Sequence, residues 1–251
     1  MKKLCLGTWQ FESTFKRIDL EEARKVIEYA RGVGINAFDT ALVYENQEIE
    51  KLLGSTIAKN SFMITKVPAI KKPMINNMET IESYYPLSNL KIDIEKSHKN
   101  LQKIPDVMLL HNWSKAWDNS HSAKKVFTYM KELKNKNYFR YFGVSLPNYY
   151  GENISEWLLK EIDFVEVPLN EKNQWILKYL DQVKEFGVRV CVRSLFEAGK
   201  FFDLKRENSE VVKRIKEAYK IADYVIIGMT SEKTIDKNIE IFKNEEGREG
   251  I

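Results

Sequence analysis

The segment Ile35-Asn36-Ala37-Phe38-Asp39-Thr40-Ala41-Leu42-Val43-Tyr44-Glu45-Asn46 decides how the chain can be organised. Its short apolar run ends at Asp39, and Tyr44 follows five positions later. Such a run, closed by polar residues, is typical of a fully buried strand in a parallel sheet. A carboxylate at the end of a strand, with a phenol just beyond it, provides groups that can take part in acid–base chemistry.

The same pattern of a short apolar strand followed by an amphipathic helix recurs eight times along the chain. Strands are expected at residues 4–6, 35–38, 62–65, 106–110, 141–144, 164–167, 188–192 and 224–227. The sixth helix is expected from Trp175 to Phe186, and Ser231 is expected to cap the last one. Eight such repeats in 251 residues predict one α/β domain over residues 1–251, a (β/α)8 TIM barrel, ending in a short polar tail from about residue 243. A doubly wound open sheet is the alternative, but no Gly-x-Gly-x-x-Gly follows the first strand.

The composition of the chain restricts which kinds of binding partner and which cellular compartment are expected. The 251 residues are 43% hydrophobic and 30% charged, and 40 basic residues against 36 acidic ones give a net charge of only +4. This small, dispersed excess does not indicate a nucleic-acid partner. The N-terminus has no apolar signal region, and no apolar run approaches the roughly 20 residues of a membrane span. The chain is therefore expected to be cytoplasmic, with no membrane partner, and Cys5 and Cys191 are expected to be core thiols.

In a barrel of this kind the active site lies at the carboxyl ends of the strands. Asp39 follows the second strand, Lys66 the third and His111 the fourth, and Tyr44 lies in the loop after the second strand. Neighbouring strands would thus direct a carboxylate, an ammonium group and an imidazole toward one opening, beside a phenol. We expect these four residues to form a catalytic site.

The chemistry of these four side chains can be predicted. A free tyrosine has a pKa near 10, and a nearby Lys66 cation would lower that pKa and make Tyr44 a usable acid. Asp39 would pair with Lys66, and His111 could orient a substrate carbonyl. No nucleophile with a base beside it and no metal-ligand cluster is found, so no metal is expected. A tyrosine acid acting on a carbonyl needs a hydride from elsewhere, which implies a nicotinamide cofactor.

These motifs resemble those of the aldo-keto reductase family over nearly the whole chain. The matching segments are Leu6-Gly7-Thr8-Trp9, residues 34–41 with Tyr44, residues 64–67, residues 106–111, residues 143–145, and residues 227–231 with Asn238. The resemblance implies that Tyr44 is the general acid, that Lys66 and Asp39 tune it and that His111 orients the substrate. It also implies a nicotinamide cofactor bound in an extended form across the barrel opening.

The resemblance further implies a set of cofactor contacts around this opening. These are Gly7, Thr8, Trp9, Asp39, Ser145, Glu166, Arg193, Ser194, Leu195, Phe196, Gly199, Gly228, Thr230, Ser231 and Asn238. Trp9 and Trp113, in early loops, are expected to line a substrate pocket.

Several positions depart from the family pattern. Leu146 stands where an asparagine is usual, Glu166 where a glutamine is usual, and Arg193 replaces the ring that commonly stacks on the nicotinamide. Thr234 stands where many NADP-using members have an arginine for the 2′-phosphate, and Lys233 is available to replace it. The balance favours NADP over NAD by a small margin.

The leading prediction is an NAD(P)H-dependent reductase that converts an aldehyde or ketone to an alcohol. Its substrate is expected to be a small carbonyl compound of a polar or sugar-derived kind. One alternative is a nucleotide-binding sensor or partner subunit that has the same fold but no turnover. The replacements at Leu146 and Glu166 keep this alternative open. Another is a sugar-modifying enzyme that uses bound cofactor for internal redox chemistry. The sequence indicates no oligomeric state.

Overall fold

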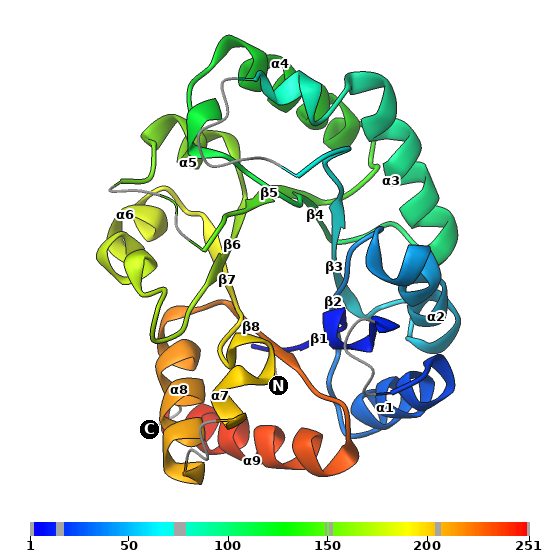
Figure 1. The fold of residues 1–251 in the computed structure, drawn as a ribbon, viewed down its shortest axis with the longest axis vertical. Helices are drawn as coiled ribbons and strands as arrows, with labels where there is room; N and C mark the ends of the chain where they lie inside the picture. Colours follow the sequence, from blue (N-terminus) through cyan, green and yellow to red (C-terminus); the bar gives the residue numbers. More distant parts are fainter. Residues whose placement is uncertain are drawn as a thin grey trace.

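A closed barrel of parallel strands forms the centre of the protein. The structure, a computed structural model, describes residues 3–13, 18–72, 79–148, 150, 153–203 and 207–249. Within these residues, β1 to β8 pair in chain order, and β8 pairs back onto β1 (Figure 1). The strands are β1 (Leu4–Gly7), β2 (Ala37–Asp39), β3 (Phe62–Val67), β4 (Val107–Leu110), β5 (Tyr141–Ser145), β6 (Phe164–Pro168), β7 (Arg189–Arg193) and β8 (Tyr224–Gly228). The predicted (β/α)8 barrel is confirmed, and the open sheet is excluded.

Helices surround the barrel, as Figure 1 shows. They are α1 (Leu20–Gly32), α2 (Glu48–Thr56), α3 (Leu87–Leu101), α4 (His121–Asn135), α5 (Glu156–Glu161), α6 (Leu180–Glu185), the short α7 (Lys200–Asp203), α8 (Asn208–Ile221) and α9 (Glu232–Glu249). The first of them starts with a capping box, in which the side chains of Asp19 and Glu22 accept hydrogen bonds from each other's backbone N–H. None of the helices in the described ranges is long and apolar enough to cross a membrane.

Alternate residues of each strand belong to two separate apolar clusters. In β4, Met108 and Leu110 pack in the large cluster that includes the helices, whereas Val107 and Leu109 pack in a smaller one with Cys5 and Cys191. Because successive side chains point to opposite faces of a strand, the smaller cluster fills the barrel interior. Both cysteines are buried free thiols, as expected. Because side chains fill the barrel interior, a ligand-binding site has to lie at the ends of the strands.

Two expected segments differ from the structure. The sixth helix was expected as one run from Trp175 to Phe186, but it consists of a 3-10 turn at Trp175–Lys178 followed by α6. The expected polar tail is part of α9, which continues to Glu249, while residues 250 and 251 lie outside the described residues. The polar sequence concealed this because Glu245 is buried and pairs with Lys216 of α8 at 3.3 Å.

Candidate active site

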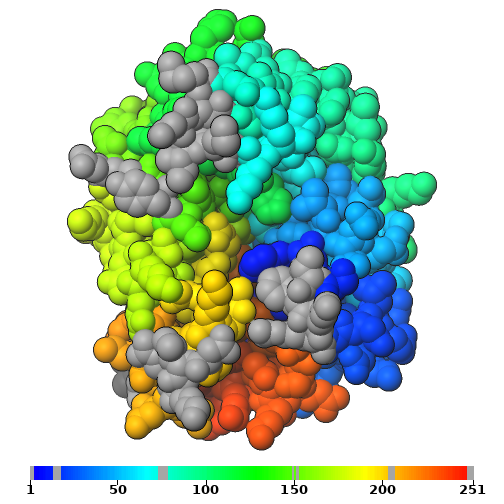
Figure 2. Space-filling view, in the orientation of Figure 1, coloured from blue at the N-terminus to red at the C-terminus, as the bar shows by residue number. Residues whose placement is uncertain are grey.

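A cavity of about 600 Å³ opens at the carboxyl ends of the strands. In Figure 2 the yellow segment just after β7 and the blue N-terminal segment approach each other near the middle of this face. The lining residues come from the strand ends and from the loops after β1, β2, β3, β4, β7 and β8. They are Gly7, Trp9, Gln10, Glu12, Asp39, Val43, Tyr44, Lys72, His111, Asn112, Ser145, Glu166, Arg193, Ser194, Leu195, Phe196, Ala198, Gly199, Phe202, Ile226, Ile227, Gly228 and Thr230.

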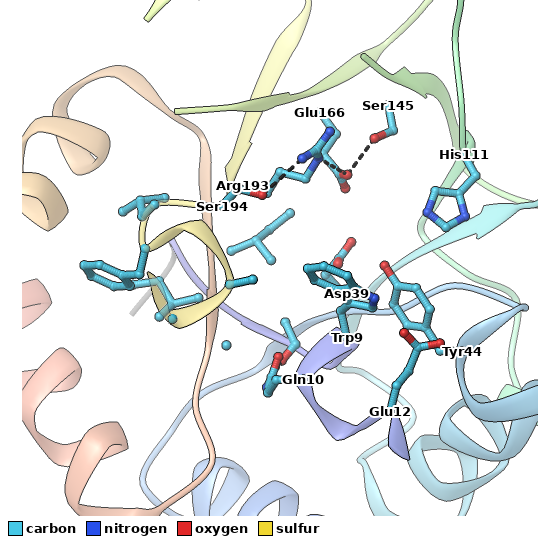
Figure 3. A pocket seen from close by; sticks show the side chains of 18 of the residues that line it. Trp9, Gln10, Glu12, Asp39, Tyr44, His111, Ser145, Glu166, Arg193 and Ser194 are labelled. Carbon is cyan, nitrogen blue, oxygen red and sulfur yellow. Dashed lines mark hydrogen bonds and ion pairs between the residues drawn. The ribbon is translucent and has the colours of Figure 1, made fainter. Parts of the chain in front are cut away.

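Three of the four predicted catalytic residues, Asp39, Tyr44 and His111, line this cavity, and Lys66 is buried against Asp39 without lining it. The Nζ atom of Lys66 lies 2.5 Å from Oδ2 of Asp39 and donates a second hydrogen bond to the carbonyl oxygen of Thr40 at 2.9 Å. The same Nζ atom lies 5.7 Å from the centre of the Tyr44 ring. The rings of Tyr44 and His111 meet edge to face, with centroids 5.9 Å apart. Figure 3 shows the Tyr44 hydroxyl pointing between Asp39 and His111.

Register explains why these side chains meet. Asp39 is the last residue of β2 and pairs with Ile64 of β3, so Lys66 lies two residues further along the neighbouring strand. His111 follows directly on β4, and its backbone N–H donates to the carbonyl oxygen of Val67. Because the strands are parallel and adjacent, their ends present these groups at one edge of the barrel. The pairing of β2, β3 and β4 therefore brings the three side chains together.

The ammonium of Lys66 is buried between two carboxylates. Burial alone would lower the pKa of Lys66, but Asp39 and Glu166 outweigh it and raise that pKa above its usual value. Burial raises the pKa of Asp39 to about 7, Lys66 opposes this shift and Glu166 adds to it. Lys66 is therefore a permanent cation, and Asp39 titrates near neutrality.

Tyr44 is held as a neutral phenol. The sequence predicted that Lys66 would lower its pKa; Lys66 does act in that direction, but burial is the larger effect and raises the pKa of Tyr44 above its ordinary value. Desolvation disfavours a phenolate more than one cation at this distance favours it. Burial and the charge of Lys66 lower the pKa of His111 to about 3, so its imidazole is neutral. The cavity therefore contains a phenol O–H and a neutral imidazole side by side.

Glu166 forms the opposite wall with Ser145 and Arg193 (Figure 3). Its Oε1 atom accepts a hydrogen bond from Oγ of Ser145 at 2.8 Å and lies 3.1 Å from Nε of Arg193. Its Oε2 atom lies 3.3 Å from Nζ of Lys66. Burial alone would raise the pKa of Glu166, but Lys66 and Arg193 hold it below its usual range. Arg193 also donates to the carbonyl oxygen of Leu146 at 2.8 Å.

A second cavity, of about 590 Å³, adjoins the first. Both cavities have Phe196, Phe202, Ile227, Gly228 and Thr230 in their walls. The second one is completed by α8 and α9, which contribute Asn208, Val211, Val212, Lys216, Thr234, Lys237, Asn238, Glu240, Ile241 and Asn244. Together the two cavities form an elongated site that begins at Tyr44 and ends between α8 and α9.

Each cavity contains a buried polar atom with an unused hydrogen-bonding capacity. Among the described residues, Nδ2 of Asn238 in the second cavity has no hydrogen-bond partner, and Oε2 of Glu166 in the first has none besides its ion pair with Lys66 at 3.3 Å. Buried polar atoms are nearly always hydrogen-bonded in native proteins, so these two atoms can bond to a ligand or a water molecule. An acceptor at one end and a donor at the other fit an extended ligand with polar groups at both ends. A dinucleotide has this form.

Most predicted cofactor residues line one of the cavities, but three of the predicted residues have other roles. Thr8 is fully buried and donates its hydroxyl to the carbonyl oxygen of Asp39. Ser231 is exposed and accepts a hydrogen bond from the N–H of Thr234 at the start of α9. Trp113 does not line the substrate cavity, contrary to the prediction. It is 2% exposed, stacks on Phe127 and donates its indole N–H to Asp118.

Other residues of the cavity were not predicted. Gln10 and Glu12 lie in the turn after Trp9, Lys72 lies beyond β3, and Asn112 follows His111. Of these, Asn112 had a usable signal, because it directly follows a predicted strand-end residue. Clusters of three or more metal-ligating side chains are absent from the residues that the structure describes.

Comparison with known proteins places this geometry in context. The sequence profile described as "Aldo/keto reductase family" matches residues 3–224. A comparison with curated proteins gives no significant match. Among solved structures, the holo form of an aldo-keto reductase from Bacillus halodurans is 20% identical, with a TM-score of 0.70, over 96% of this chain and 86% of that one.

Two further solved structures have the same fold. An aldo/keto reductase from Klebsiella pneumoniae in complex with NADP and acetate is 15% identical, with a TM-score of 0.68, over 95% of this chain and 85% of that one. A glycerol dehydrogenase from Gluconobacter oxydans is 16% identical, with a TM-score of 0.67, over 92% and 84% of the two chains. At this identity the structures support the fold, and the family profile carries the assignment. The chain belongs to the aldo/keto reductase family and is an NAD(P)H-dependent oxidoreductase.

Proposed function

We propose that the protein reduces an aldehyde or ketone to an alcohol, with the proton supplied by Tyr44. The observation that carries the proposal is the neutral phenol of Tyr44, which lines a cavity beside a buried ammonium and a neutral imidazole. A bound nicotinamide cofactor would supply the hydride. Glu166, Ser145 and Arg193 would hold its nicotinamide end, and Asn238 and Thr230 its adenosine end.

The side chains then have separate tasks. The neutral imidazole of His111 donates a hydrogen bond to the carbonyl oxygen and positions it next to Tyr44. The Tyr44 hydroxyl gives its proton to that oxygen as negative charge develops there. The phenolate that remains is stabilised by the ammonium of Lys66, which has its ion pair with Asp39 to hold it in place. Proton donation is thus promoted at the moment of reaction, although the resting pKa of Tyr44 is high.

The walls next to Tyr44 favour a polar substrate. Glu12, Lys72 and Asn112 line this part of the cavity, and Trp9 is 45% exposed there. Carboxylate and amide groups form hydrogen bonds with the hydroxyl groups of a substrate, and an indole face packs on the substrate's carbon skeleton. A small hydroxylated aldehyde or ketone, such as a sugar derivative, fits these groups. Consumption of NADPH, followed by absorbance with a panel of plain and hydroxylated carbonyl compounds, tests the proposal; no consumption with any of them would contradict it.

The rate of reduction is expected to rise as the pH falls through about 7. Asp39, with a pKa of about 7, is the group that titrates, since the pKa of His111 is about 3 and Tyr44 stays protonated. Its protonation removes one negative charge beside Lys66, which stabilises the Tyr44 phenolate and makes Tyr44 a stronger acid. We expect kcat to increase several-fold between pH 8.5 and 5.5 and Asp39→Asn to abolish this dependence. A transition that persists unchanged in Asp39→Asn would contradict the assignment.

Lys237 is expected to set the preference for NADP over NAD. The sequence suggested Lys233 for the 2′-phosphate, but Lys237, not Lys233, lines the second cavity, close to Thr234 and Asn238. Lys237 is exposed and has no ion pair within the described part of the chain. We expect Lys237→Ala to raise the Kd for NADPH about three- to tenfold and to leave that for NADH unchanged. Lys233→Ala is the matched control, and an equal loss in both variants would contradict the prediction.

A further inference from the structure

Glu166 is bound in a manner that requires a carboxylate rather than an amide. Each of its oxygens faces a cation, Oε1 at 3.1 Å from Nε of Arg193 and Oε2 at 3.3 Å from Nζ of Lys66. A glutamine would direct its NH₂ group, which cannot accept a hydrogen bond, at one of these two cations. The side chain is 1% exposed and nevertheless forms part of the cavity wall. Its negative charge therefore acts within the cavity with little screening by water.

The charges in the ion-pair network around Glu166 balance only when Glu166 is ionised. Four charged groups form one network, with Asp39 and Glu166 as anions and Lys66 and Arg193 as cations. His111, with a pKa of about 3, adds no charge. Above the pKa of Asp39 the sum is zero, and replacing Glu166 by a neutral residue changes it to +1. At this wall of the cavity, the preference for a cation over a neutral molecule therefore changes with the charge of Glu166.

The charge of Glu166 lies on the side of the cavity where the reacting end of the cofactor would bind. Tyr44 and His111 lie on one side of the cavity, and Glu166 and Arg193 lie across from them (Figure 3). A carbonyl that receives a proton from Tyr44 must contact that side, so the hydride donor has to enter between the carbonyl and the Glu166 wall. A bound dinucleotide would therefore have its nicotinamide end, and not its adenosine end, in this cavity.

We propose that Glu166 makes this cavity selective for the oxidised, cationic form of the nicotinamide cofactor. The inference rests on the proposed function. Breaking the C–H bond of the donor transfers a hydride, with its two electrons, to the carbonyl carbon, while the Tyr44 proton goes to the carbonyl oxygen. This oxidises the donor and leaves it positively charged, and the Glu166 carboxylate stabilises that charge. Bound reduced cofactor thereby becomes a stronger hydride donor, and bound oxidised cofactor dissociates more slowly.

The test is the ratio of two dissociation constants, that of oxidised NADP⁺ divided by that of NADPH, measured by calorimetric titration at pH 8. We expect Glu166→Gln to raise this ratio on the order of tenfold, because the wall becomes net positive. Glu166→Asp keeps the charge and should keep the ratio within about threefold of the wild-type value. The matched control is Glu50→Gln, since Glu50 is also a buried carboxylate, bonded to Thr65 and Asn100 away from the cavity. It should leave the ratio unchanged.

Arg193→Gln tests the same inference by removing a cation instead of an anion. It does not depend on the folding of a Glu166 variant. Removing this cation makes the wall net negative, so the ratio should fall several-fold. Ratios that stay within about twofold of wild type in both Glu166→Gln and Arg193→Gln would overturn the inference and leave the proposed function intact. If the wild-type protein bound neither form, the proposed function would fail as well.

Discussion

Replacing Tyr44 by phenylalanine is expected to lower kcat for carbonyl reduction by about a hundred- to ten-thousandfold, the usual contribution of a general acid. The phenol of Tyr44 is neutral, lines the cavity and lies against His111 and Lys66. When its proton leaves, the ammonium of Lys66 stabilises the phenolate that remains. The variant keeps the ring and removes only the hydroxyl. Cofactor affinity should therefore be retained, which steady-state kinetics and NADPH titration would show together.

The matched control is Tyr150→Phe. Tyr150 is another buried tyrosine, but its hydroxyl bonds to Asp118 and the residue does not line the cavity. Its loss should leave kcat unchanged. If Tyr44→Phe retained more than about a tenth of the wild-type kcat, Tyr44 would not be the proton donor.

Replacing Lys66 by methionine is expected to lower the free energy of unfolding by about 3–5 kcal/mol, the cost of removing one partner from a buried ion pair. Asp39 and Glu166 would then both lie buried without the cation that now separates them, at 2.5 and 3.3 Å from its Nζ atom. Urea denaturation at pH 8, where Asp39 is ionised, measures this loss. Activity should fall as well, because the Tyr44 phenolate would lose its neighbouring cation.

A combined variant separates the charge effect from the loss of packing. Lys66→Met with Asp39→Asn and Glu166→Gln removes the three charges together, so most of the lost stability should return, while activity should stay low. A single Lys66→Met variant within about 1 kcal/mol of wild type would show that the two carboxylates do not depend on Lys66 for their burial.

Strand ends were readable from the sequence because a parallel barrel places them all at one face. Asp39, Lys66 and His111 each follow a short apolar run, and that position alone locates Asp39 and His111 at the cavity and Lys66 next to Asp39. The contact between Lys66 and Glu166 was not readable in this way. It joins β3 to β6 across the barrel, and no pattern along the chain encodes which side chains meet there.

Burial was the property that the sequence concealed most. Trp113 and Trp9 both occur just after strands, yet Trp113 packs against Phe127 and Trp9 is exposed in the cavity. The sign of the Tyr44 pKa shift was mispredicted for the same reason, because the ammonium of Lys66 is visible in the sequence and the desolvation of the phenol is not. Positions at strand ends can be predicted from the pattern along the chain. The burial of a side chain, and the pKa shift that burial causes, cannot.

We expect a nicotinamide dinucleotide to span the two adjoining cavities, with its reacting end between Tyr44 and Glu166. A crystal structure of the protein grown with NADP⁺ tests it most directly. We expect the nicotinamide ring in the cavity lined by Tyr44, His111 and Glu166, and the adenosine beside Asn238, with Oε2 of Glu166 and Nδ2 of Asn238 both hydrogen-bonded. A dinucleotide bound in the reverse direction, or bound outside these cavities, would contradict it.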